Sequence, residues 1–223
     1  MSNREITMSN REIVVKGIGK AAATPDLIVL TMKLEVTEPE YDFTIRRATQ
    51  MLDTLRIAIV SAGHDGKKLK TTSFNINTKF ESYKEKGDWK QRFIGYSCVH
   101  DLCLEFDLDM PMIGATLGAI ARCDANPNFS IKFSIKDPNA VSEQLLTSAV
   151  ENAKWKASVL ATAAGITLGT IQRIEYNWSD IHLYSKTTMN DSALHLATEP
   201  LGIDIEPEEV NVSDSATVIW AIE

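Results

Sequence analysis

The longest alternation of apolar and polar residues lies near the middle of the chain and predicts an unusually long strand. Its shared face carries eight side chains: Ile94, Tyr96, Cys98, His100, Leu102, Leu104, Phe106 and Leu108. Period 2 is typical of a half-buried strand, and typical strands have only about 5 to 6 residues. A second alternation over 74–80 precedes it, across a polar stretch at Lys86-Gly87-Asp88. The two segments predict a long β-ribbon closed by a hairpin.

Three stretches change to the period of a helix. From Tyr41 to Ala62 apolar residues recur every three or four positions, and Gly63 follows as the expected C′ residue. A second helix is expected over 109–120, because Asp109 is a suitable N-cap. A third is expected over 137–165, where Asp137-Pro138 combines an N-cap with proline at the first helical position.

The remaining alternating segments predict strands over 13–19, 28–37, 129–135, 168–178 and 216–222. Strands and helices do not alternate strictly, so the order predicts an α+β fold with helices packed on a largely antiparallel sheet. The stretches 27–80 and 94–135 both run strand, helix, strand. Because both stretches have the same order of elements, the sequence is consistent with a degenerate internal duplication.

The first residues hold an immediate repeat, since MSNREI at Met1–Ile6 recurs at Met8–Ile13. A duplication this short is no structural repeat, so residues 1–7 are interpreted as a duplicated start or a cloning remnant and are expected to be disordered. We expect residues 8–223 to form a single domain. Within it, residues 179–214 show no sustained period and are expected to be irregular.

Charge and composition limit which compartments and which partners are expected for the protein. The net charge of −7, from 23 basic and 30 acidic residues, disfavours nucleic acid. No window approaches the ~20 apolar residues of a membrane span. Because the start is polar and the three cysteines form no dense framework, we expect a cytoplasmic protein with free thiols.

Two motifs resemble ligand sites but have simpler interpretations. Gly17-Ile18-Gly19-Lys20-Ala21-Ala22 matches a dinucleotide fingerprint, yet a strand follows where a helix must open, so the glycines are interpreted as a strand irregularity or bulge. Cys98, His100 and Cys103 are zinc-ligand types, but strand parity sends Cys103 to the other face. We therefore expect a buried thiol and a hydrogen-bonded core histidine, with no metal or cofactor.

Candidate binding residues fall into two groups. The segment 179–214 gathers His182, Tyr184 and His195 and is a candidate ligand segment, although it contains no recognisable catalytic motif. Trp155 interrupts the polar side of the third helix, where it either covers a loop or anchors an interface. Tyr96, near the start of the long strand, is the other candidate interface residue.

Several segments, in this order, resemble the SIMPL-domain family across residues 13–223. They are Val15-Lys16-Gly17-Ile18-Gly19-Lys20 with Thr24-Pro25-Asp26, Thr71-Thr72-Ser73-Phe74-Asn75-Ile76, Ile94-Gly95-Tyr96, and the stretch from Phe133-Ser134-Ile135 through Asp137-Pro138 and Ala149-Val150 to Leu168-Gly169.

The resemblance implies an α+β fold without established active-site residues. The family takes its name from a eukaryotic signalling adaptor that associates with a pelle-like kinase. Many bacterial members are periplasmic proteins linked to oxidative-stress defence, and some build ring-like or channel-like oligomers. Unlike those members, this sequence shows no apolar leader. We expect a non-catalytic homo-oligomer acting as a stress-related scaffold or adaptor, with a protein partner as a further expectation. The alternative is a small-ligand binder or enzyme using residues 179–214.

Overall fold

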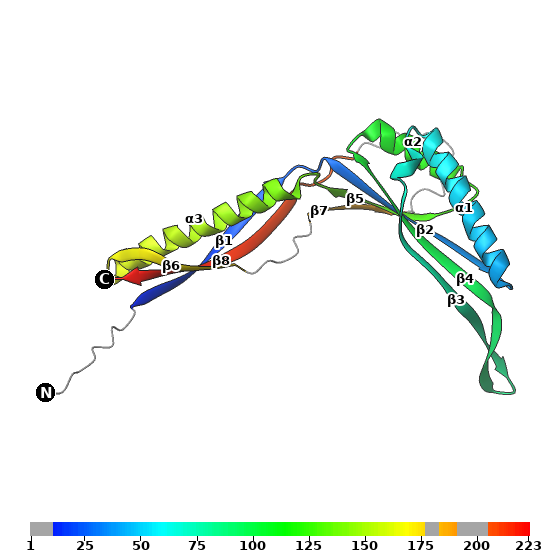
Figure 1. Cartoon of the computed structure of the whole chain (residues 1–223), viewed down its shortest axis with the longest axis horizontal. Helices are drawn as coiled ribbons and strands as arrows, with labels where there is room; N and C mark the ends of the chain where they lie inside the picture. Colours follow the sequence, from blue (N-terminus) through cyan, green and yellow to red (C-terminus); the bar gives the residue numbers. More distant parts are fainter. Residues whose placement is uncertain (1–10, 177–182, 191–204) are drawn as a thin grey trace. The chain divides into compact units, whose positions relative to one another are not determined.

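The computed structural model describes residues 11–176, 183–190 and 205–223. The described residues contain three α-helices, one short 3-10 helix and eight strands (Figure 1). Their bounds are β1 Glu12–Ala23, β2 Leu27–Glu38, α1 Tyr41–Ser61, η1 Gly66–Lys68, β3 Lys70–Glu85, β4 Asp88–Asp107, α2 Met110–Ala121, β5 Asn128–Ser134, α3 Pro138–Ala164, β6 Leu168–Tyr176, β7 Tyr184–Asn190 and β8 Val210–Ile222. The prediction of an α+β fold with antiparallel sheets is confirmed.

These elements form two compact units. Of the described residues, the first comprises 11–24, 135–176, 183–184 and 209–223, and the second comprises 25–134, 185–190 and 205–208. Residues 1–7, which were expected to be disordered, lie outside the described residues. The prediction of a single domain over residues 8–223 stays a prediction.

The first unit is a three-stranded antiparallel sheet, in the order β1-β8-β6, with α3 packed on it (Figure 1). Asp137 caps the start of α3 by accepting from the amides of Asn139 and Ala140, and Gly165 ends it with a φ of 68°. The sequence predicted the Asp137 cap and a helix that runs to Gly165. The buried stripe of α3 is mostly alanine, so the helix can lie close to β1 and β8.

The glycines of β1 permit this close approach. A Cβ added at Gly17 would lie 1.9 Å from the Ala149 carbonyl oxygen, and one at Gly19 would lie 2.1 Å from the Leu145 carbonyl oxygen. β1 pairs with β8 in unbroken register from Glu12 to Ala23. The interpretation of these glycines as a bulge is therefore wrong, since they make room for a helix backbone.

The second unit is a five-stranded sheet in the order β3-β4-β2-β5-β7. Apart from the short η1, its first six elements run β2-α1-β3-β4-α2-β5, and each strand–helix–strand crossover skips one central strand. This is the ferredoxin-like, split βαβ arrangement. Both strand–helix–strand stretches expected from the sequence are present, and the arrangement gives them the same topology.

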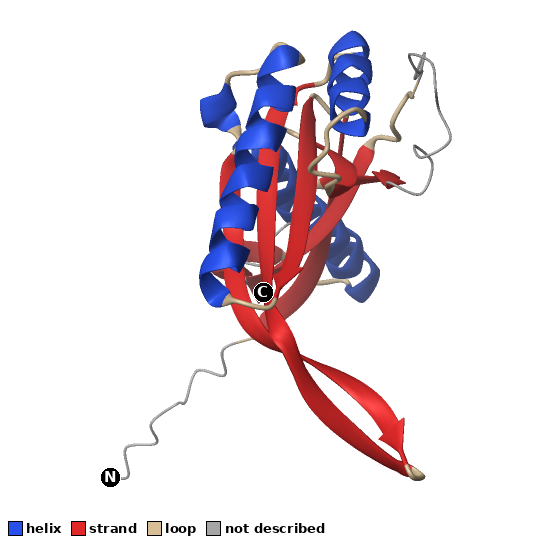
Figure 2. Ribbon diagram, turned by 90° about the vertical axis from the view of Figure 1, so that its right-hand side faces the viewer, coloured by secondary structure: helices blue, strands red, loops and turns tan. Residues whose placement is uncertain are grey.

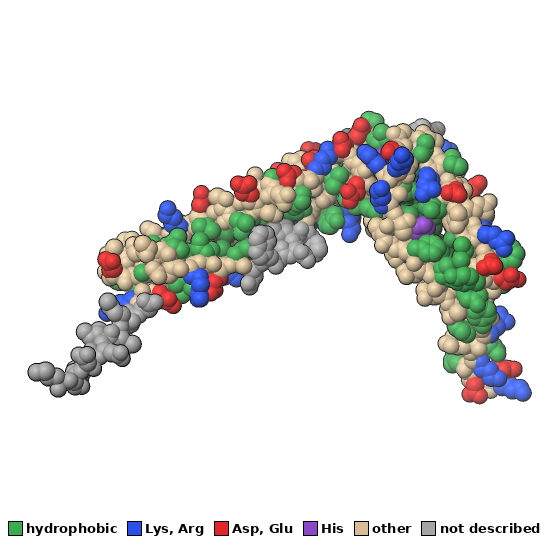
Figure 3. Space-filling view, viewed as in Figure 1, with side chains coloured by type: hydrophobic (Ala, Val, Ile, Leu, Met, Phe, Trp, Pro, Cys, Tyr) green, Lys and Arg blue, Asp and Glu red, His purple; other side chains and the backbone are tan. Residues whose placement is uncertain are grey.

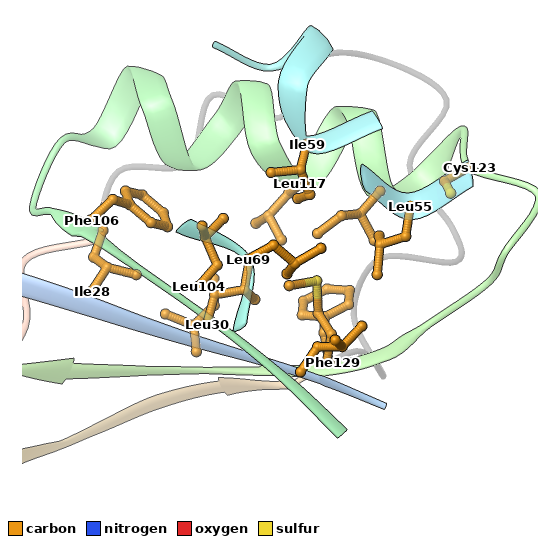
Figure 4. Close-up of a cluster of buried hydrophobic side chains, with 14 of the residues drawn as sticks. Ile28, Leu30, Leu55, Ile59, Leu69, Leu104, Phe106, Leu117, Cys123 and Phe129 are labelled. Carbon is orange, nitrogen blue, oxygen red and sulfur yellow. The ribbon is translucent and has the colours of Figure 1, made fainter. Parts of the chain in front are cut away.

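Helices α1 and α2 pack on the same face of this sheet, and the larger core lies beneath them (Figure 4). The labelled side chains come from both helices and from the central strands, among them Leu30, Leu55, Leu104 and Leu117. On β2 the opposite face carries the exposed Thr31, Lys33 and Glu35, so that strand is half-buried as its alternation predicts.

The stretch expected to be irregular, residues 179–214, is only partly so. Tyr184–Asn190 forms β7, which pairs with β5, and β8 begins at Val210. The Ser185 hydroxyl donates to the Glu208 carbonyl at 2.7 Å, which ties β7 to the coil before β8. The expectation of irregular structure is therefore wrong for both strands.

Candidate functional site

The site begins where two strands leave the five-stranded sheet. β4 pairs with β2 only over Tyr96–Asp107, whereas its pairing with β3 continues to Asp88. Residues 80–93, here called the outer ribbon, are therefore two-stranded, and Figure 2 shows them extending beyond the sheet. The predicted long ribbon is confirmed.

Backbone geometry explains where the ribbon departs and where it turns. Gly95 has a φ of 143°, and a Cβ there would lie 2.2 Å from the Glu38 carbonyl oxygen. The β3–β4 register shifts beside it, between Lys79 and Phe80. At the far end, Lys86 and Gly87 have φ values of 52° and 99°, as a two-residue I′ hairpin turn requires.

An aromatic ladder follows the ribbon toward the sheet. It consists of Phe80, Phe93, Tyr96 and Tyr41, whose successive ring centroids are 5.8, 5.4 and 5.5 Å apart in edge-to-face geometry. Phe80 is 54% exposed and Phe93 48% exposed. Such contacts stabilise the ribbon, but half of each outer ring still faces solvent. In Figure 3 hydrophobic side chains gather along this arm of the second unit.

Charged side chains flank the exposed Trp89 at the ribbon's end. Arg92 donates two hydrogen bonds to one Glu81 carboxylate oxygen, at 2.8 and 2.6 Å, and Lys90 pairs with Glu85. Trp89 is 73% exposed. Because these ion pairs are exposed to solvent, each contributes little to stability.

His100 is a buried residue of β4, in the part that pairs with both β2 and β3. Its Nε2 lies 2.8 Å from the Thr71 hydroxyl, and Phe74 packs edge-to-face on its ring at 5.0 Å. Burial lowers the pKa of His100; nearby Arg56 also lowers it, and Asp101 acts the other way. The prediction of a hydrogen-bonded core histidine is confirmed.

The cysteines near His100 behave as core and surface thiols. Cys98 is buried on the core face, where burial raises the pKa of its thiol. Cys103 is half-buried, and burial together with Glu105 raises the pKa of its thiol. Among the described residues, no three histidine, cysteine or carboxylate side chains are grouped as metal ligands.

The structure separates the residues proposed from the sequence. Tyr96 belongs to the aromatic ladder and is half-buried against its own unit, while Trp155 lies on the outer side of α3 and is 64% exposed. Tyr184 begins β7 and is 43% exposed. His182 and His195 lie outside the described residues, so the candidate ligand segment stays a prediction.

Sequence reasoning missed most of the aromatic ladder, although the signal was present. Once the turn is placed at Lys86-Gly87, counting outward along both strands opposes Phe80 to Phe93. Tyr41 could not be found this way, because it comes from the start of α1.

The described geometry defines an α+β protein with two sheets. One is three-stranded and packs against a helix, and the other is ferredoxin-like and carries a two-stranded ribbon. The chain belongs to the SIMPL family, described as a protein of unknown function, whose profile matches residues 13–220. The resemblance noted in the sequence is thus confirmed.

Curated relatives are similar over most of the chain. The 26 kDa periplasmic immunogenic protein of Brucella melitensis is 26% identical over 175 residues, covering 76% of this chain and 68% of its own length. Its Brucella abortus counterpart is 25% identical over the same shares. Uncharacterized protein YggE of Edwardsiella ictaluri is 19% identical over 208 residues, covering 93% and 85%.

These relatives correct the expected compartment. Two of them are named periplasmic, so the expectation of a cytoplasmic protein is wrong. Within the described residues, no helix is both long and apolar enough to cross a membrane.

Proposed function

We propose that this protein is a non-catalytic, self-assembling protein whose copies associate through the outer ribbon. The observation that carries the proposal is the two-stranded segment at residues 80–93. A two-stranded ribbon is at best marginally stable in water unless a further strand or surface covers it. A second copy can supply that cover, because symmetric self-association is the usual form of soluble assemblies.

The contrast between two sheet edges supports this choice. Along the free edge of β1, side chains of α3 satisfy the backbone: Asn152 accepts from the Ile18 amide at 2.9 Å, Ser148 accepts from the Lys20 amide at 3.2 Å, and Lys156 donates to the Lys16 carbonyl at 3.0 Å. β3 ends the five-stranded sheet, and its outer edge has no such cover among the described residues. Open edges readily pair with another chain.

The periplasmic names of the relatives support the same compartment for this protein. Self-association through the outer ribbon in that compartment requires neither a nucleotide nor a metal. Osmotic-shock fractionation of the source cells tests the compartment. Recovery of the protein with cytoplasmic markers would contradict it.

Sedimentation velocity at micromolar concentration, with chelator present, tests the assembly. The wild-type chain is expected to sediment as an oligomer, and Phe93→Asp to shift it toward monomer by placing a charge in a desolvated contact. Trp155→Asp is the matched control, since Trp155 is also exposed but lies on α3.

Each other outcome has a definite meaning. A strictly monomeric wild-type chain removes the proposal. If Trp155→Asp dissociates the oligomer and Phe93→Asp does not, the interface lies on α3 and the ribbon assignment is wrong. Tyr96→Asp should also weaken assembly, but it disturbs the internal contact with Tyr41 and is therefore the weaker probe.

A further inference from the structure

The tip of the ribbon, residues 83–90, combines exposed aromatic rings with lysines. Trp89 is 73% exposed and Tyr83 is 37% exposed. Lys84 is the cross-strand partner of Trp89, and Lys90 is the partner of Tyr83. Tryptophan and tyrosine favour the boundary between water and lipid, because each joins an apolar ring to a polar group.

Alternation places these two pairs on opposite faces of the ribbon. Each face thus carries one aromatic ring and one lysine near the turn, and Lys86 lies in the turn itself. A flat partner that meets only one face would leave the other ring in water. A surface approached end-on contacts both rings and all three lysines.

The charge of the ribbon differs in sign from that of the rest of the chain. Residues 80–93 carry four basic and three acidic side chains, a net charge of +1, whereas the whole chain carries −7. The exposed pairs Lys90–Glu85 and Arg92–Glu81 are weak, so their cations can turn to other anions at little cost.

The tip lysines lie far enough from the five-stranded sheet that its negative charge is screened at the tip. From Phe80, where the two-stranded part begins, to Lys86 the chain extends by about 20 Å at about 3.3 Å per residue. The Debye length at physiological salt is about 8 Å. Beyond that distance the negative charge of the sheet and helices is screened, so the tip presents a local positive charge.

We propose that the tip docks end-on to an anionic phospholipid surface. Lysines contact the phosphates, and Trp89 and Tyr83 enter the headgroup layer. Polybasic segments bind anionic leaflets in proportion to their charge, so a tip with few net charges binds weakly and reversibly. This inference does not depend on self-association.

Vesicle co-sedimentation of the full chain tests the inference. At low salt the protein should pellet with vesicles of equal parts phosphatidylcholine and phosphatidylglycerol at least about tenfold better than with phosphatidylcholine alone. Binding should fall at ~0.5 M salt. The double variant Lys84→Glu, Lys86→Glu should lose about tenfold in binding, and Trp89→Ser should lose several-fold.

Two controls match these variants. Lys154→Glu with Lys186→Glu changes the net charge equally at two exposed lysines on α3 and β7, and Trp155→Ser removes another exposed tryptophan. Both controls should bind vesicles like wild type. Thermal midpoints of all variants, measured in parallel, identify any that fail to fold. If one tip variant fails to fold, the other tip variant tests the inference.

Three results would overturn the inference: equal binding to both vesicle types, no vesicle binding, or tip variants that bind as wild type does. If wild type fails to bind vesicles while tip variants lose self-association without lipid, the tip contacts a second copy instead. A monomeric chain that still binds anionic vesicles would refute the proposed assembly and leave this inference standing.

Discussion

The structural roles of individual residues were predictable from the sequence when they depend on neighbours a few positions away in the chain. Asp109 and Asp137 cap helices as expected, because a capping side chain bonds to amides only two or three positions later. Gly17 was misinterpreted because the atoms that exclude a side chain there belong to α3, more than a hundred positions later in the chain. His100 was predictable as a core residue from strand parity, but its partner Thr71 was not.

The buried histidines predict a loss of stability in mild acid. Burial lowers the pKa of His64, with Lys68 lowering it further, and burial likewise lowers that of His100. The Thr116 hydroxyl donates to the Met112 carbonyl and therefore accepts from Nε2 of His64, at 2.6 Å. Burial thus favours the neutral form of both imidazoles in the folded protein.

The folded state therefore binds protons less readily than the unfolded chain, whose histidines titrate near pH 6.5. Stability is fully present above that pH. As pH falls below it, each histidine should lower the free energy of unfolding by up to about 1.4 kcal/mol per pH unit, until its folded pKa is reached. Urea unfolding between pH 7.5 and 5, which are ~1 unit above and ~1.5 below the free value, should show this slope, and His64→Gln should reduce it. A profile unchanged by that substitution would contradict the assignment to His64.

Helices and strands were predictable from the sequence where apolar residues keep a period of 2 or 3.6. The contacts between these elements were less predictable. Counting three or four residues on from the buried Ala157 leads to Leu160 and Ala161, and periodicity does not say which is inward: Ala161 is buried and Leu160 is half exposed. β7 was missed because its inward positions include Ser185 and Thr187, which give no apolar alternation. The aromatic ladder was only partly predictable, since hairpin counting finds one pair and tertiary packing supplies Tyr41.

The contact between β1 and α3 predicts a severe effect of a single methyl group. Gly17→Ala would place its Cβ 1.9 Å from a helix carbonyl oxygen and 2.6 Å from the Ala153 amide nitrogen, both backbone atoms. The helix must move, and we expect a loss of about 3 kcal/mol or more. Thermal unfolding should show a much lower midpoint.

Gly118→Ala is the matched control for that change. Its Cβ would meet only the flexible end of Arg122, at 3.4 Å, within α2. Alanine favours a helix over glycine by up to about 1 kcal/mol, so this variant should be neutral or more stable. If Gly17→Ala unfolds like wild type, β1 and α3 do not pack as described.

At the scale of the whole molecule, fold class was predictable but strand order and compartment were not. The order of elements excludes strict βαβ alternation, yet periodicity does not say which strands pair. Counting cysteines does not decide the compartment, because the count takes no account of their burial. Cys98 and Cys123 are buried, and a buried thiol can stay reduced where exposed thiols would oxidise.

The second unit should fold without the first. Every fully buried residue of its core lies between Ile28 and Phe133, and only the partly buried Met189 and Ile205 come from elsewhere. A fragment spanning residues 25–134 keeps α1, α2 and four of the five strands. We therefore expect it to unfold cooperatively with heat, at a lower midpoint than the full chain because β7 is lost.

Circular dichroism and the binding of a hydrophobic dye measure this outcome. A fragment with native secondary structure, a sharp thermal transition and little dye binding would show that residues 25–134 are an independent folding unit. A broad transition with strong dye binding indicates a molten state, in which the core has lost its fixed packing. That result would mean that the remaining residues are required for the fold, as the expectation of a single domain over residues 8–223 implies.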